Sequence, residues 1–318
     1  MNKSSSSAEP NPLSQTRTES GPASAQRLSI LIVSYNEKGH LAPCLESIRR
    51  FAPSDTQVVL EDNASTDGSV DAAAKDYPWV QIVRSSRNLG FPGGNNLAAE
   101  NARGKFILLL NADTLLLEPI APAVDWLESH PAYGALTVNM LDGDRVARAC
   151  TGKFPTAMRL VKMSSMLVPP EKYGSEEAYD VDWVQGSFLL VRADLWRVLN
   201  GLDERYFPIY VEDVDFCRRI RDAGFKCAYL PQIHYLHWGG YDVSKFPVQV
   251  RSLATYVGIH MSGLELTLSR AVLLAGCLVR AVLFKAKGVL SDPDFNRKKS
   301  NACRRAFEAL IQREIRKR

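Results

Sequence analysis

Short apolar runs alternate with helix-like segments over the first third of the chain. Residues 28–34 are apolar and β-branched, as is typical of a parallel strand that is buried on both faces. Further strands are predicted at 57–61, 80–83 and 105–110. Helices are predicted around 41–48, 69–76 and 94–102. This alternation favours an α/β fold with an open, mainly parallel sheet flanked by helices.

The second half of the chain follows a less regular pattern. Strands are predicted at 183–192 and 225–230, and a helix at 213–223. Residues 250–284 are helical in pattern and very apolar. A membrane-spanning helix needs about 20 mostly apolar residues, whereas Arg270 and Arg280 leave only nine uncharged residues between them. The pattern therefore favours an interfacial or oligomer-facing helix over a membrane span.

These patterns divide the chain into three parts. Residues 1–27 are rich in Ser, Pro and Ala without an apolar core, so they are predicted to be a disordered leader and not a secretory signal. Residues 28–245 are predicted to form the α/β domain, and residues 246–318 an apolar and basic helical extension.

Charge is unevenly distributed along the chain. The net charge is +4, but the segment from Lys285 onward carries eleven Lys or Arg against four Asp or Glu, a local charge of +7. A basic tail suits an anionic partner, either membrane phospholipid or nucleic acid, although a merely solvated basic helix has the same pattern. An apolar helix beside a basic tail favours a membrane surface, so we expect no nucleic-acid partner. The six cysteines show no CxxC or zinc-site spacing, which fits a cytoplasmic protein.

Polar clusters follow four of the predicted strands. In open α/β sheets the ligand lies beyond the carboxyl ends of the strands, so these clusters are where a ligand site is expected. They are Ser34-Tyr35-Asn36, Asp62-Asn63, Arg87-Asn88 and Asn111-Ala112-Asp113.

Two of these carboxylates suggest specific chemistry. Asp113 directly follows a buried apolar strand, where a carboxylate needs a cation or a hydrogen-bond donor, and a divalent ion with diphosphate oxygens would meet that need. Asp62 could bind a ribose hydroxyl or a base N–H. Either residue could instead cap a turn. The glycine-rich segment 90–94 could approach a diphosphate, but it matches no phosphate-loop fingerprint.

The later part of the chain adds a base and a metal ligand. Glu212 and Asp213 open a predicted helix, where one of them could act as a general base. Acidic residues in a first helical turn also complement the helix dipole, so a purely structural role stays open. His237 follows a predicted strand and could be a metal ligand or a structural residue.

The order of these motifs resembles the family 2 glycosyltransferases, specifically the bacterial rhamnosyltransferase-like branch. The resemblance extends from Leu28 to about Tyr241. It rests on Ile32-Val-Ser-Tyr-Asn36, Asp62-Asn-Ala-Ser-Thr-Asp-Gly68, Arg87-Asn-Leu-Gly-Phe91, Gly93-Gly-Asn-Asn96, Asn111-Ala-Asp113, Gln185-Gly-Ser-Phe188, Glu212-Asp-Val-Asp-Phe-Cys-Arg218 and His237-Trp-Gly-Gly240.

The resemblance implies a GT-A fold over residues 28–245 and an inverting transfer that uses Mg²⁺ or Mn²⁺. It implies that Asp213 is the catalytic base, with Glu212 as the alternative, and that Asp113 and His237 are the metal ligands. One residue departs from the family pattern, because Asn111 stands where the first Asp of Asp-x-Asp is expected. The residues expected to contact the donor are Ser34, Tyr35, Asn36, Glu37, Asp62, Arg87, Asn88, Asn96 and Asn111.

The implied partners are a dTDP- or UDP-sugar donor, with L-rhamnose favoured, and a glycan or polyprenyl-linked acceptor of envelope polysaccharide synthesis. We expect a cytoplasmic location, on the inner face of the membrane if the tail binds lipid, or a homo-oligomer if the C-terminal helices pair. Two alternatives are an inactive nucleotide-sugar binding or scaffold protein and a sugar-1-phosphate nucleotidyltransferase. The latter needs a basic glycine-rich loop after the first strand, which residues 34–39 do not supply.

Overall fold

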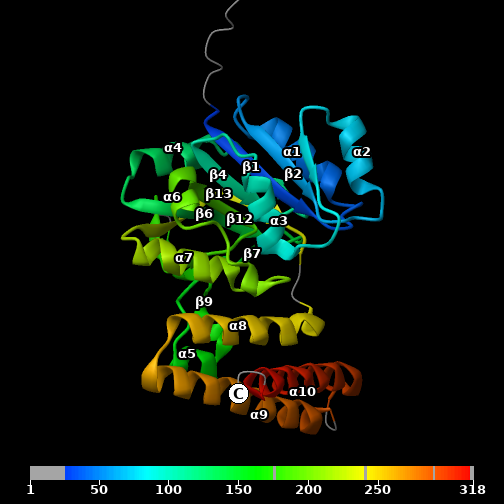
Figure 1. The fold of residues 1–318 in the computed structure, drawn as a ribbon, viewed down its shortest axis with the longest axis vertical. Coiled ribbons are helices and arrows are strands. Elements are labelled where there is room, and N and C mark those ends of the chain that lie inside the picture. The colour runs from blue at the N-terminus through cyan, green and yellow to red at the C-terminus, as the bar shows by residue number, and fades with distance from the viewer. Residues whose placement is uncertain (1–25, 175–176, 240–241, 289–290, 316–318) are drawn as a thin grey trace, which may run out of the picture.

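A ten-stranded sheet forms the centre of the molecule (Figure 1). The computed structural model describes residues 26–174, 177–239, 242–288 and 291–315. One half of the sheet is parallel, in the order β4-β1-β2-β3. The central strands β1 and β4 are apolar and buried almost throughout, as the sequence predicted, whereas the edge strand is only partly buried. The four strands are β1 (Leu28–Ser34), β2 (Gln57–Asp62), β3 (Gln81–Arg84) and β4 (Phe106–Leu110).

The other half of the sheet is mixed. β12 (Phe188–Arg192) is antiparallel to both β4 and β6 (Tyr133–Leu141), and β6 runs parallel to β13 (Lys226–His237). Three short strands complete this sheet: β5 (Thr114–Leu116), β7 (Ala147–Arg148) and β10 (Tyr179–Val181). A separate small sheet contains β8 (Thr151–Gly152), β9 (Leu167–Val168) and β11 (Trp183–Val184). The single strand predicted at 183–192 is therefore two strands, because residues 185–187 leave the ladder and face the cavity described below.

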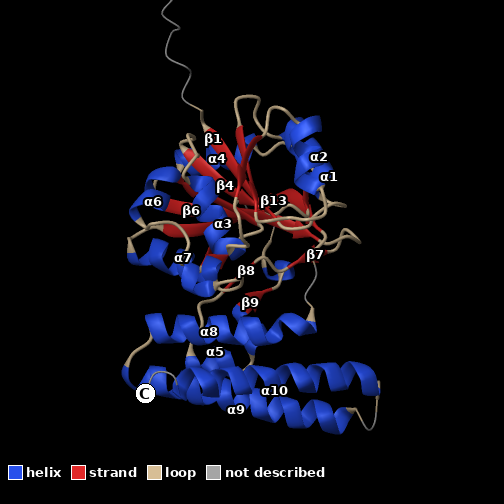
Figure 2. Ribbon diagram, turned by 45° about the vertical axis from the view of Figure 1, so that its right-hand side comes forward, coloured by secondary structure: helices blue, strands red, loops and turns tan. Residues whose placement is uncertain are grey.

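Helices flank the sheet and complete the α/β domain (Figure 2). They are α1 (Leu41–Phe51), α2 (Ser69–Asp76), α3 (Gly90–Ala99), α4 (Ala121–Ser129), α6 (Ala193–Val198) and α7 (Glu212–Asp222). Short 3₁₀ turns include η1 (Met163–Met166), η2 (Pro170–Lys172), η3 (Glu204–Tyr206) and η4 (Val243–Lys245). The predicted GT-A arrangement, with a C-terminal helical region, is confirmed.

The C-terminal helices form a separate layer at one end of the molecule (Figures 1 and 2). This layer contains α8 (Phe246–His260), α9 (Gly263–Lys287) and α10 (Pro293–Ile315), and the short helix α5 (Ala157–Val161) packs against α9. Helix α8 joins the layer to the α/β domain, because its apolar side contributes Val250, Leu253, Tyr256 and Val257 to the main core.

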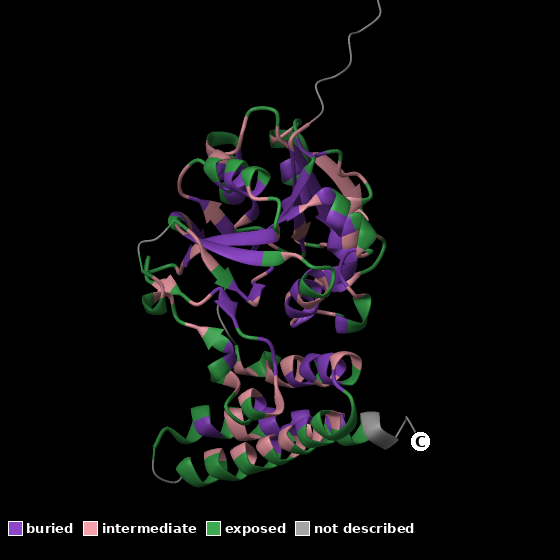
Figure 3. Ribbon diagram, turned by 90° about the vertical axis from the view of Figure 1, so that its left-hand side faces the viewer, coloured by how far each residue is buried: buried purple, intermediate pink, exposed green. Residues whose placement is uncertain are grey.

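Helix α9 presents an apolar face to solvent (Figure 3). Within the described residues it is the one helix whose length and composition would allow it to cross a membrane, and only 17% of its most apolar window is buried. We call its exposed residues the apolar face of α9: Leu264, Leu268, Leu278, Val279, Val282 and Leu283.

Candidate active site

The carboxyl ends of β1, β2 and β4 open onto one large cavity. Its volume is about 1390 Å³, and it extends from this sheet edge to helices α5, α8 and α9. Seven of the residues predicted from the sequence line it: Tyr35, Glu37, Asn88, Asn111, Asp113, Asp213 and His237. Six do not: Ser34, Asn36, Asp62, Arg87, Asn96 and Glu212. The cavity therefore lies at the sheet edge that the strand-end rule indicated.

Asn63 is a cavity residue that the sequence reasoning missed. Its Oδ1 accepts a hydrogen bond from the Leu89 backbone N–H at 2.6 Å, and its Nδ2 donates to Asn88 Oδ1 at 3.2 Å. Asn63 thereby fixes Asn88 at the cavity wall and holds the start of α3 against the end of β2. Its position directly after Asp62 at a strand end was the available signal.

Asn36 and Asp62 hold loops in place behind the cavity wall. Asn36 has a positive φ of 59°, which Asn tolerates, and its Oδ1 accepts from the Thr66 N–H at 2.8 Å. Asp62 accepts from the Ser65 N–H at 2.9 Å and from Arg84 Nη1 at 2.8 Å. Both carboxylate oxygens of Asp62 thus accept bonds from within the fold, and contact with a donor stays a prediction.

The remaining predicted donor residues lie farther from the cavity. Asn96 binds the loop before η3, with its Nδ2 donating to Leu202 O at 2.8 Å and its Oδ1 accepting from the Leu202 N–H at 2.9 Å. Ser34 is buried at the end of β1, and Arg87 is exposed. A donor contact by these three side chains stays a prediction.

The glycine-rich segment 90–94 is helical, in contrast to the phosphate-approaching loop suggested above. It forms the first turns of α3. A Cβ at Gly94 would lie 2.8 Å from Glu61 Oε2 and from a Val33 methyl, and one at Gly90 would lie 2.6 Å from Pro208 O. Gly90 also has a φ of +71°. Close packing of α3 on β1 and β2 therefore accounts for these glycines.

Asn111, Asp113 and His237 converge at the end of β4. Antiparallel pairing of β5 with β13 places His237 opposite Thr114, and His237 Nε2 lies 3.3 Å from Asp113 Oδ1 and 3.3 Å from Asn111 Nδ2. Burial alone would raise the pKa of Asp113, but the contact with His237 outweighs burial and holds this pKa below its usual value. The three side chains are mostly buried yet border the cavity.

This cluster fits a divalent cation that is completed by ligand oxygens. Asn111 Oδ1 is buried without a hydrogen-bond partner, and a Cβ at Gly239 would lie 2.6 Å from both Asp113 Oδ2 and His237 Nε2. Carboxylate oxygen and imidazole nitrogen are ligands that Mn²⁺ accepts. Within the described ranges, no group of three or more His, Cys, Asp or Glu side chains is arranged to hold a metal. Asp113 and His237 therefore supply a partial ligand set.

Asp213 reaches the cavity from the start of α7. The two residues before this helix, Tyr210 and Val211, have φ values of 84° and 72°, which is unusual for a β-branched residue and marks a strained turn. The turn directs Asp213 inward, where Oδ2 accepts from the Gly186 N–H at 3.0 Å and Oδ1 from the Val214 N–H at 2.8 Å. Burial raises the pKa of Asp213, although these backbone donors counter part of that shift.

Glu212 is a weaker candidate base than its neighbour. It does not line the cavity, and its Oε2 is buried without a partner. Burial, reinforced by the adjacent Asp213 charge, raises the pKa of Glu212 well above its ordinary value. Because Asp213 lines the cavity and Glu212 does not, the geometry favours Asp213 as the base.

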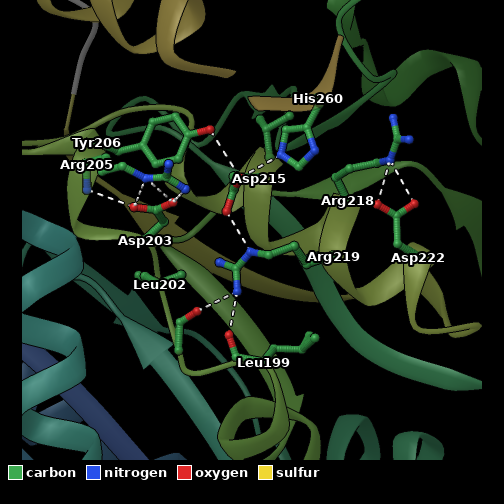
Figure 4. Close-up of polar contacts among 12 residues, drawn as sticks. Leu199, Leu202, Asp203, Arg205, Tyr206, Asp215, Arg218, Arg219, Asp222 and His260 are labelled. Atoms are coloured by element: carbon green, nitrogen blue, oxygen red, sulfur yellow. Dashed lines mark hydrogen bonds and ion pairs between the residues drawn. The ribbon is translucent and has the colours of Figure 1, made fainter. Parts of the chain in front are cut away.

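A hydrogen-bonded cluster around Asp215 holds α7 in position (Figure 4). Asp215 is buried, and its carboxylate lies 2.7 Å from His260 Nε2 of α8, 3.2 Å from the Tyr206 hydroxyl and 2.8 Å from Arg219 Nε. Arg219 also donates to Leu199 O at 2.7 Å. These bonds connect the helix that carries Asp213 to η3 and to the C-terminal layer. Truncation before α8 would therefore disturb the candidate base.

Comparison with known proteins agrees with this geometry. Residues 29–154 match the family model described as glycosyl transferase family 2. The chain is 29% identical to N-acetylglucosaminyl-diphospho-decaprenol L-rhamnosyltransferase of Mycobacterium tuberculosis, over 69% of this chain and 78% of the relative. It is 26% identical to rhamnosyltransferase WbbL of Escherichia coli, over 68% of this chain and 85% of the relative.

Solved structures share the fold. A mannosyltransferase from Pyrobaculum calidifontis, in complex with GDP-Man and Mn²⁺, aligns with a TM-score of 0.56 at 16% identity, over 90% of this chain and 87% of that one. GalNAc-T7 with UDP, GalNAc and Mn²⁺ aligns with a TM-score of 0.57 at 17% identity, over 75% of this chain and 48% of that one. At these identities the likeness shows the fold alone.

Proposed function

Because residues 29–154 match the glycosyl transferase family 2 model and the similar relatives are rhamnosyltransferases, we propose that this chain transfers a sugar, with inversion, from a nucleotide diphosphate to a hydroxyl of a lipid-linked or glycan acceptor. One observation carries the proposal. Asp213, a buried carboxylate of raised pKa, and the Asp113–His237 pair border the same cavity. A base and a diphosphate site on one cavity are what an inverting displacement requires.

The proposed reaction uses this chain's residues in fixed roles. The Asp213 carboxylate takes the proton from the acceptor hydroxyl as the hydroxyl oxygen attacks the anomeric carbon, and the nucleotide diphosphate leaves from the opposite face. The Gly186 and Val214 N–H groups orient the Asp213 carboxylate during this transfer. Asp113 and His237 would hold Mn²⁺ or Mg²⁺, which when bound neutralises charge on the departing diphosphate.

The relatives favour L-rhamnose as the transferred sugar. Both enzymes compared above are named rhamnosyltransferases, and one acts on a diphospho-decaprenol-linked sugar. We therefore propose a dTDP-L-rhamnose donor, with a UDP-sugar as the second choice, and an acceptor linked to a polyprenyl diphosphate.

A panel of nucleotide sugars tests this function. With an N-acetylglucosaminyl lipid diphosphate as acceptor, we expect Mn²⁺-dependent release of nucleoside diphosphate from dTDP-L-rhamnose. The rate should be at least about tenfold higher than with other donors, because a site that hydrogen-bonds a particular sugar discriminates strongly against others. Product formation is followed by mass spectrometry. Binding of dTDP-L-rhamnose without turnover of any donor in the panel would instead favour a binding or scaffold protein.

We also propose that the enzyme rests on the cytoplasmic membrane surface through its C-terminal layer. The apolar face of α9 is exposed, and α10 carries Arg297, Lys298, Lys299, Arg304 and Arg305. An apolar helix face combined with basic residues suits an anionic bilayer, to which each basic residue near the surface contributes about 1 kcal/mol. A surface location would bring the cavity to a lipid-linked acceptor.

Vesicle sedimentation tests the membrane location. The full chain should sediment with vesicles that contain anionic phospholipid, and the double substitution Val279→Gln, Val282→Gln should weaken this at least about tenfold, since burying each valine contributes roughly 1.5 kcal/mol or more. Val198→Gln is the matched control, because Val198 is also an exposed valine but lies on α6 of the α/β domain. If neither the full chain nor the double variant sediments with anionic vesicles, and the protein is dimeric, the membrane proposal fails and pairing of α9 with a second copy accounts for its exposed apolar face.

A further inference from the structure

The cavity continues past the candidate base to the C-terminal layer. Its far end is lined by Lys162, Lys245 and Arg280, which we call the cationic end, together with apolar residues of α5, η1 and α8. Glu37, Asp113 and Asp213 line the part where the sugar transfer is proposed, and Asp142, Asp144 and Arg148 also line the cavity. Three cations therefore lie at the end of the cavity near the C-terminal layer.

Arg280 is held by a contact with α5. Its Nη2 donates to Val161 O at 2.8 Å, which connects α9 to the end of α5. One turn earlier on α9, Gly276 lies close to the guanidinium, since a Cβ there would lie 2.6 Å from Arg280 Nη1. The guanidinium therefore contacts both helices.

Lys162 and Lys245 add two exposed cations to the same wall. No carboxylate of a described residue lies within ion-pair distance of Lys162, Lys245 or Arg280. Their charges are consequently available to an anion. Three cations around one end of a cavity suit a multiply charged group such as a diphosphate, which accepts several charge-assisted hydrogen bonds.

Apolar surface adjoins the cationic end on the outside. Met158 and Val161 of α5 are 81% and 58% exposed, and Val279 and Val282 of α9 are 54% and 60% exposed. Helices α5 and α9 pack against each other, so these side chains belong to one region. A ligand that joins a diphosphate to an apolar chain would satisfy both surfaces.

We propose that the cationic end binds the diphosphate of a lipid-linked acceptor. The acceptor sugar then extends toward Asp213, and the apolar chain leaves the cavity over α5 and α9 toward the bilayer. The donor diphosphate occupies the opposite end at Asp113 and His237, so the two diphosphates do not compete. The placement of the acceptor sugar near Asp213 rests on the proposed function. The binding of the lipid diphosphate at the cationic end does not.

Direct binding of farnesyl diphosphate tests the proposal on the full chain. Calorimetry in excess EDTA, without donor, removes any contribution from a metal-bound diphosphate. We expect farnesyl diphosphate to bind, and the variant Arg280→Gln and the double variant Lys162→Gln, Lys245→Gln each to weaken binding about tenfold or more. Lys162 and Lys245 are exposed, so their substitution tests the site without disturbing packing.

Controls separate the chemical parts of the ligand. Lys285→Gln removes an exposed charge from α9 outside the cavity and should leave the affinity unchanged. Farnesol should bind more weakly and respond to none of the substitutions. If inorganic pyrophosphate binds with the same affinity as farnesyl diphosphate, the site does not recognise the lipid chain and that part of the assignment is overturned. If substitution of the three cations leaves farnesyl diphosphate binding unchanged, the whole assignment is overturned.

Turnover measurements distinguish this proposal from the proposed function. In the active enzyme, Arg280→Gln should raise KM for a lipid-diphosphate acceptor about tenfold while KM for the nucleotide sugar stays the same. If no nucleotide sugar is turned over but farnesyl diphosphate binding still depends on Arg280, the transferase assignment fails and the lipid diphosphate site stands.

Discussion

Replacing Asp213 with asparagine is expected to lower kcat by about 10³-fold, within the range that a general base contributes. The amide keeps the size of the carboxylate but cannot accept the acceptor proton, and only its oxygen can accept one of the two backbone N–H bonds that Asp213 receives. Donor affinity should change less than twofold, because Asp213 is proposed to contact the acceptor. Steady-state kinetics together with calorimetric titration of the nucleotide sugar measure both quantities.

The pH profile gives a second readout of the same residue. Because burial raises the pKa of Asp213, the proton-accepting form is lost as the pH falls through a value above the ordinary aspartate pKa of about 3.9. The acid limb of kcat should therefore lie above that value. Asp222→Asn, an exposed change on the same helix, is the matched control. Near-normal turnover by Asp213→Asn, with Glu212→Gln inactive, would transfer the role of base to Glu212.

Loss of the divalent cation is expected to abolish transfer. EDTA should reduce turnover below detection, and Mn²⁺ or Mg²⁺ should restore it, since neutralising a departing diphosphate is worth several kcal/mol. Asp113→Ala should lower kcat/KM at least about 100-fold for the same reason. Electron paramagnetic resonance of free Mn²⁺, with and without nucleotide diphosphate, measures metal affinity independently of turnover.

A second cavity carboxylate separates metal binding from general charge effects. Asp144 lines the same cavity, so Asp144→Ala removes a charge while leaving the Asp113–His237 pair in place. This variant should retain Mn²⁺ affinity. Full activity of the unmodified enzyme in excess EDTA would contradict the metal assignment and leave Asp113 and His237 as a structural ion pair.

The parallel half of the sheet was predictable because its strands are local in sequence. β1 and α2 have the predicted ends, β2 and β4 differ from the prediction by one residue at one end, and β3 is shifted by one residue at both ends. β6 and β12 were harder, because their neighbours in the sheet are distant in the chain and neither has an alternating pattern. Helix α3 begins four residues before the predicted start, because tight packing accommodates glycines that by propensity disfavour a helix.

Cavity residues were predictable where they follow a strand or open a helix. Asp113 follows the end of β4, and Asp213 lies in the first turn of α7. Lys162 and Arg280 were not predictable, because 118 positions separate them and only packing of α5 on α9 brings them to one wall. Asp62 is the opposite case. Its position after a strand suggested a ligand contact, but both of its carboxylate oxygens accept hydrogen bonds from Ser65 and Arg84 within the fold.

The candidate site is assembled from two separate blocks of the chain. Residues 28–113 supply most of the sheet edge proposed for the donor, and residues 162–280 supply Lys162, Asp213, His237 and Arg280. A gene fusion that joins the first block of one relative to the second block of another is therefore expected to take most donor contacts from one parent and the acceptor contacts from the other. Pairing of β5 with β13 must survive the exchange, because it brings His237 beside Asp113.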